Sequence, residues 1–152
     1  MLFRSEYELD WQARAQWRVR ANGTWARHRY GFSRVIEGGE SIVAGRDIDT
    51  APRSIHRLAL EFRPYNALAI EVEARRTGDY FADAANERRH PAQVALRLNS
   101  RWQLGDDLGL NLEIENPADQ RLADRADYAQ GDWRYFPARG RSVYFGVDWR
   151  RR

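Results

Sequence analysis

Apolar and polar residues alternate along most of this chain with a period of two. The first such stretch, 6–14, is typical, because its aromatic and aliphatic residues are separated by charged or amide residues. The same alternation recurs in 17–25, 57–63, 68–75, 93–102, 108–115 and 142–150. Successive side chains of a strand point to opposite faces, so each stretch is expected to form a strand with one apolar and one polar face. Seven such strands predict an all-β, antiparallel protein.

The connections between these strands fall into two classes. Tight turns are predicted near 14–16, 64–67 and 105–107, and long polar loops over 31–53, 79–91 and 117–140. Because antiparallel strands alternate in direction, the three long loops must gather at one end of the sheet. Short turns at one end and long loops at the other are typical of outer-membrane barrels.

The polar faces change sign from strand to strand. Their charged members are Glu8 and Asp10, then Arg18 and Arg20, then Arg57, Glu61 and Arg63, then Glu71 and Glu73, then Arg97 and Arg101, then Glu113 and Glu115. Opposite charges on neighbouring strands attract, so we expect ion pairs across the sheet, as in the polar interior of a barrel. The apolar faces would then contact lipid, with Trp11, Trp17, Trp25, Trp102 and Trp149 at the membrane interfaces. The alternative is a soluble β-barrel or sandwich that packs its apolar face as a core and binds a small ligand.

Composition excludes several other classes. All 25 basic residues are arginine, but 22 acidic residues nearly balance them, which argues against nucleic acid as a partner. The chain has no cysteine and no apolar run long enough for a transmembrane helix. His28, His56 and His90 are too far apart in sequence for a metal site and are expected on loops or at the surface. We therefore predict no enzyme activity, no cofactor and no bound metal.

Four stretches match a known pattern in the correct order and spacing. Residues 51–53 (APR) look like a loop exit before a strand, and 75–86 (RRTGDYFADAAN) look like a passage from a strand into a loop. Residues 112–121 (LEIENPADQR) look like a conserved strand-end block, and 135–147 look like a last barrel strand. Together they resemble the C-terminal portion of the barrel of TonB-dependent outer-membrane receptors. Departures are Pro117-Ala118 in place of Leu-Phe, Leu122 in place of tyrosine, and the absence of a terminal aromatic residue.

The resemblance implies an antiparallel transmembrane β-barrel segment of about seven strands. These would be the last third of a 22-stranded barrel, and they would form an open curved sheet in isolation. Seven is an odd number and bacterial barrels use even numbers, so we expect a truncated fragment. Residues 1–5 are expected to be a non-native or disordered start, and 6–152 the C-terminal barrel segment, without the plug domain. The TonB complex and the plug would be partners through the missing N-terminal part.

The implied function is TonB-energised uptake, across the bacterial outer membrane, of a ferric siderophore or a similar scarce nutrient such as cobalamin. Ligand contacts are expected from the long loops, because the charges of the polar face are largely matched. The candidates are Arg46, Asp47, Tyr80, Asp83, Arg125, Tyr128 and Trp133. Arginine and aromatic side chains suit anionic, ring-bearing metal chelates. Packing of the loops is the alternative role for each of these residues.

Overall fold

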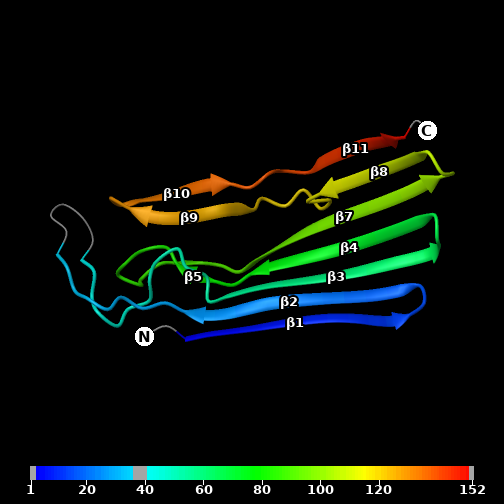
Figure 1. Cartoon of the computed structure of the whole chain (residues 1–152). Coiled ribbons are helices and arrows are strands. Elements are labelled where there is room, and N and C mark those ends of the chain that lie inside the picture. The colour runs from blue at the N-terminus through cyan, green and yellow to red at the C-terminus, as the bar shows by residue number, and fades with distance from the viewer. Residues whose placement is uncertain (1–2, 36–40, 151–152) are drawn as a thin grey trace.

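The structure, a computed structural model, describes residues 3–35 and 41–150. Its main element is one open, curved antiparallel sheet of seven strands, with β1 and β11 as its edges (Figure 1). The strands, in spatial order, are β1 (Phe3–Arg14), β2 (Trp17–Arg27), β3 (Ser54–Tyr65), β4 (Leu68–Thr77), β7 (Gln93–Leu104), β8 (Leu108–Glu115) and β11 (Ser142–Trp149). The predicted seven-stranded antiparallel sheet is therefore confirmed. No helix in the described part of the chain is long and apolar enough to cross a membrane.

The two classes of connection lie at opposite ends of the sheet, as predicted. Tight turns join β1 to β2, β3 to β4 and β7 to β8, and Gly105 in the last of these has a φ of 76°, which favours glycine. The three long connections gather at the other end, which we call the long-loop end (Figure 1).

The long connections contain more structure than the sequence indicated. The second holds the short strands β5 (Tyr80–Phe81) and β6 (Arg89–His90), and the third holds a hairpin of β9 (Ala123–Ala129) and β10 (Asp132–Pro137). The prediction that 117–140 is a plain loop is therefore wrong. Alternation did not reveal β9, because Arg125, Asp127 and Asp124 put charges on both of its faces. The expected disordered start falls partly outside the described residues, and Phe3 to Ser5 pair with β2.

Register aligns the apolar residues of all seven strands on one face. One row across the sheet reads Trp11, Val19, Leu60, Val72, Leu98, Ile114 and Val143. Within this row Trp11 is 56% exposed and Val143 is 62% exposed, so no second layer covers the face. The buried hydrophobic residues in the described ranges are Ala59, Tyr80, Ala82, Ala84, Ala123 and Ala126. A sandwich of two packed sheets is thus not what the described residues form.

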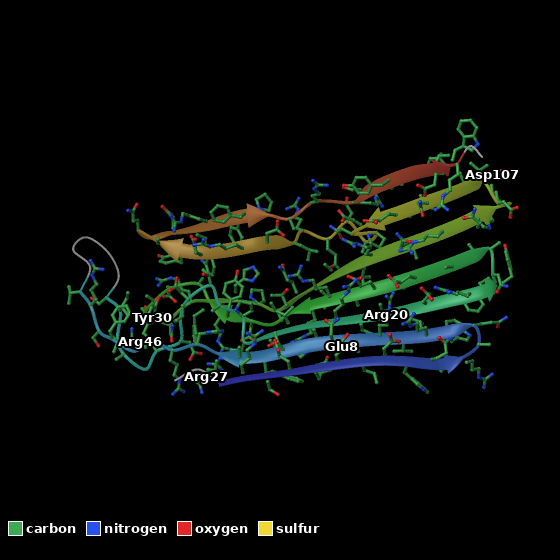
Figure 2. The ribbon with its side chains drawn as sticks, viewed as in Figure 1. Glu8, Arg20, Arg27, Tyr30, Arg46 and Asp107 are labelled. Carbon is green, nitrogen blue, oxygen red and sulfur yellow. The ribbon has the colours of Figure 1, made fainter. Side chains whose placement is uncertain are left out.

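The other face of the sheet carries the predicted ion pairs. Arg18 Nε lies 2.8 Å from Asp10 Oδ1, and Arg97 contacts Glu115 at 3.2 Å. Further pairs join Arg20 to Glu71, Arg57 to Glu73, Arg63 to Glu61 and Arg97 to Glu113. Figure 2 labels Glu8 and Arg20, which belong to the edge strand β1 and its neighbour β2. The strand-by-strand change of charge is therefore matched by contacts in space.

Four of the five tryptophans expected at the membrane interfaces lie near strand ends, whereas Trp11 lies in the row with Leu60 and Val72; all five are exposed. Trp17 begins β2 and Trp149 ends β11, while Trp102 lies near the end of β7, where its Nε1 donates to the Tyr65 hydroxyl at 3.4 Å. Trp25 lies near the other end of β2, next to the long connections. This gives the apolar face an aromatic border at both ends.

Candidate functional site at the long-loop end

Asp47 holds the first long connection together. Its side chain is 10% exposed and accepts hydrogen bonds from Arg27 Nε at 3.1 Å and Arg53 Nε at 2.8 Å. Arg29 Nε lies 3.7 Å away and completes a set of three arginines. Burial alone would raise the pKa of the Asp47 carboxyl, but the hydrogen bonds and charges of Arg53 and Arg27 outweigh it and lower the pKa. Asp47 is therefore an ionised, fully paired anchor.

Asn86 joins the first long connection to the second. Its Oδ1 accepts from the Asp47 backbone N–H at 2.8 Å, and its Nδ2 donates to the Asp47 carbonyl at 2.9 Å. Asn86 has a φ of 57°, a left-handed conformation that asparagine tolerates better than most residues. A backbone bond from Thr50 N to Phe81 O at 2.7 Å adds a second link. Sequence reasoning missed Asn86, because its contacts are with a segment far away in the chain.

Asp83 closes the second connection on itself. Its carboxylate is 1% exposed and accepts from the backbone N–H groups of Glu87 and Arg88, each at 3.0 Å. Arg88 Nη1 lies 3.4 Å from the other oxygen. The side chain faces no open space, so Asp83 shapes the loop.

Tyr80 ties the second connection to the hairpin of the third. Its hydroxyl accepts from the Ala126 N–H at 2.8 Å, and Tyr128 N donates to the Ala82 carbonyl at 2.8 Å. Tyr80 is 7% exposed, and burial raises the pKa of its phenol. The three long connections thus form one continuous assembly at this end of the sheet.

A row of aromatic rings leads from this buried tyrosine to the surface. Tyr80 stacks on His90 with centroids 5.0 Å apart, His90 lies 6.4 Å from Tyr135, and Tyr135 stacks on Trp133 at 5.7 Å. Tyr128 meets Trp133 edge-on at 5.9 Å. Trp133 is 38% exposed and Tyr135 is 59% exposed, so the row ends in rings that an incoming molecule can contact. Sequence reasoning missed Tyr135, although its two-residue spacing from Trp133 places both rings on one face of a strand.

One guanidinium group contacts these rings, and two other candidate arginines lie elsewhere at the long-loop end. The Arg88 Cζ lies 3.7 Å from the Tyr128 ring centroid, a cation–π contact. Arg125 is exposed, donates to Asp127 at 2.6 Å and lies 5.5 Å from the Phe136 ring, on the opposite face of the hairpin from Trp133. Arg46 is partly exposed in the first connection, where its carbonyl accepts from Tyr30 N at 2.9 Å. Figure 2 places Arg46 and Tyr30 at the long-loop end.

A hollow of about 670 Å³ lies between this hairpin and the start of β7. Its lining includes His90, Gln93, Arg121, Leu122 and Tyr135. His90 is 6% exposed and its Nδ1 has no hydrogen-bond partner among the described residues. Burial lowers the pKa of the imidazole, so the ring is neutral near pH 7. His90 lies in a long connection, as expected, but it is buried there and not at the surface, and His56 lies in strand β3.

The seven predicted site residues thus divide by geometry. Asp47, Tyr80 and Asp83 are buried and connect or close the loops. Tyr128 and Trp133 belong to the aromatic row, while Arg46 and Arg125 lie apart from it and from each other. No group of three or more metal-ligating side chains occurs within residues 3–35 and 41–150.

Comparison with known proteins finds solved structures with a similar fold. No protein-family model and no curated protein sequence matches the chain. The siderophore receptor PiuA from Acinetobacter baumannii is 19% identical with a TM-score of 0.76, over 97% of this chain and 21% of that chain. The ferric yersiniabactin uptake receptor FyuA from Yersinia pestis is 18% identical with a TM-score of 0.70, over 93% and 22%. A mutant ferric enterobactin receptor, PfeA from Pseudomonas aeruginosa, in complex with enterobactin, is 17% identical with a TM-score of 0.69, over 95% and 22%.

These matches concern the fold. The chain folds as a segment of such receptors and spans about a fifth of their length. The resemblance to the barrel of TonB-dependent receptors is confirmed at that level.

Proposed function

We propose that this chain forms part of the barrel wall and of the extracellular rim of a TonB-dependent receptor in the bacterial outer membrane. The observation that carries the proposal is the uncovered apolar face, which runs without interruption across seven strands. The strands have 8 to 12 residues, the length needed to cross a bilayer as a tilted β-strand. The ion-paired opposite face suits a polar lumen.

The two sheet edges support a wall that continues beyond this chain. The backbone groups on the outer sides of β1 and β11 pair with no strand among the described residues. In a bilayer every backbone N–H and C=O needs a partner, so the edges require neighbouring barrel strands. We infer that the rest of the receptor supplies these strands, the plug domain and the contact with the TonB complex.

The cargo we propose is a ferric siderophore or a similar metal chelate. The similar solved structures are receptors for such compounds, and one of them holds enterobactin. In this chain the exposed rings of Trp133 and Tyr135, with Arg88 against the neighbouring Tyr128 ring, offer stacking surfaces and positive charge. Both features suit a planar, anionic chelate. Arg46 and Arg125 are proposed as further charged contacts.

The test is a titration of the receptor that contains this segment with the chelate. Quenching of the receptor's tryptophan fluorescence measures the binding. Replacing Trp133 and Tyr135 together by alanine should weaken binding about tenfold or more, because each lost stacking contact costs about 1 kcal/mol. Tyr65→Ala, which removes an exposed ring at the tight-turn end of the sheet, is the matched control and should leave binding unchanged. Equal affinity for both variants and the parent would contradict the assignment of this site.

A further inference from the structure

The apolar face changes character at the long-loop end. The row that includes Leu58 contains only apolar residues: Leu9, Ala21, Leu58, Ala74 and Leu96. The next paired row toward the long loops reads Tyr7, Gly23, His56, Arg76 and Val94. His56 and Arg76 are therefore direct cross-strand neighbours on the side of the sheet that the proposed function turns toward lipid. They mark the border of the apolar band.

Gly23 allows two rings to meet above β2. Tyr7 and His56 flank this glycine on the two neighbouring strands, and their side chains lie 3.2 Å apart from Tyr7 Oη to His56 Nδ1. A Cβ on Gly23 would come within 2.3 Å of His56 Nδ1 and 2.7 Å of Tyr7 Cε1. Trp25 contacts the same imidazole edge-on at 4.5 Å. His56 is thus held in place from two sides.

This arrangement leaves hydrogen-bond donors of His56 and Arg76 available to a ligand. When the Tyr7 hydroxyl donates to Nδ1, the neutral imidazole carries its proton on Nε2, which can donate to a ligand. Arg76 is exposed, and its Nη1 donates to Ser54 Oγ at 3.4 Å, which leaves most of its guanidinium donors available. Guanidinium groups bind phosphate through charge-assisted hydrogen bonds.

We propose that Arg76 and His56, bordered by the rings of Tyr7 and Trp25, bind the phosphate of an anionic lipid in the outer leaflet of the membrane. Long loops are extracellular in barrels of this type, so the row lies at the level of the outer headgroups. The rings of Tyr7 and Trp25, 39% and 49% exposed, lie beside the acyl-chain boundary, where such side chains are favoured. The proposal rests on the proposed membrane location of the sheet.

The neighbouring residue provides a matched control. Arg75 is also exposed on β4, but it lies on the polar face, and within the described residues it makes no ion pair. Arg75→Gln and Arg76→Gln therefore remove the same charge from adjacent positions on opposite faces of one strand.

The experiment measures, by native mass spectrometry, the lipids that the receptor containing this segment retains in mixed micelles of phosphatidic acid and phosphatidylcholine. The unmodified receptor should retain phosphatidic acid in excess. Arg76→Gln should lower this excess about fivefold, because one cation contributes about that much to binding at an anionic surface. Arg76→Lys keeps the charge and should therefore keep most of the excess. Arg75→Gln should leave it unchanged. His56→Gln is a second variant and should also reduce the excess.

Four results would overturn the proposal. The first is an equal loss of phosphatidic acid in Arg75→Gln and Arg76→Gln, which indicates nonspecific charge attraction. The second is displacement of the lipid by millimolar inorganic phosphate, which indicates a site for a free anion. The third is a receptor whose tryptophan emission shows no insertion into the micelles, which contradicts the membrane location itself. The fourth is insertion with no preference for phosphatidic acid, which overturns the lipid site alone.

Discussion

Arg20 of β2 forms an ion pair with Glu71 of β4, across the intervening strand β3. The residue of β3 opposite Arg20 is Ala59, whose small side chain is 3% exposed. Glu71 also lies directly opposite Glu61, an arrangement that repels unless cations are near. Arg20 and Arg63 supply those cations, so the pairing stabilises three strands at once.

A larger side chain at position 59 should prevent this contact. We expect Ala59→Leu to lower the free energy of unfolding in detergent micelles by about 1 kcal/mol, through crowding and loss of the ion pair. Guanidinium unfolding measures the change. Ala95→Leu, on the same face of the sheet but in β7 and two rows away from Glu71, should change the stability much less. An equal loss of stability in both variants would mean that the ion pair between Arg20 and Glu71 makes no specific contribution to the free energy of unfolding.

Asp47 should be the residue whose loss loosens the long loops most. Asp47→Asn leaves Arg27, Arg29 and Arg53 without their shared carboxylate, which should cost roughly 3 kcal/mol of local stability. Limited trypsin digestion should then cut the first long connection faster. Asp132→Asn, in the exposed hairpin, is the control and should leave the digestion rate unchanged. Unaltered digestion of Asp47→Asn would contradict the anchoring role.

The lowered pKa of Asp47 gives the loops a predictable pH dependence. A carboxyl whose folded pKa lies below its ordinary value of 3.8 stabilises fully above that value. The stabilisation is lost as the pH falls through the lower, folded pKa. Trypsin is inactive there, so hydrogen exchange of the loop amides is the measurement. If the protection of the loop amides in Asp47→Asn falls with pH as it does in the unmodified chain, the pH dependence belongs to another group.

Tyr80 should determine how firmly the hairpin is held. Tyr80→Phe removes the acceptor of the buried Ala126 N–H and should raise the exchange rate of that amide about tenfold, equivalent to about 1.4 kcal/mol. Tyr135→Phe keeps its exposed ring and should have no such effect, since the structure gives its hydroxyl no part in holding β9. Unchanged exchange of Ala126 in Tyr80→Phe would show that the Tyr128 to Ala82 backbone bond suffices.

The sheet could be predicted from the sequence because its determinants are local. Alternation defines each long strand, and matching of the apolar faces then fixes a register in which Trp11, Leu60 and Val143 share one row. The same reasoning predicted the ion pairs between strands of opposite charge.

The candidate site could be predicted only in part, because its determinants are distant in the chain. Asp47 and Asp83 belong to a residue type that suits ligands, yet the arginines and backbone N–H groups that bury them are visible only in the folded loops. His90 gave no signal in the sequence, since its burial depends on Tyr80 and Tyr135 from two other segments. The aromatic row therefore emerged from the structure.

The central claim is that the apolar face contacts lipid and the polar face does not. The chain has no cysteine, so a spin label can be placed at single introduced cysteines along β7, from Ala95 to Trp102, in lipid vesicles. The rate at which the label collides with oxygen, which concentrates in lipid, should oscillate along the strand with a period of two residues. It should peak at 96, 98, 100 and 102. Collision with a water-soluble nickel complex should peak at the residues between them. An absence of oscillation, or oxygen maxima at Arg97 and Asn99, would contradict the account.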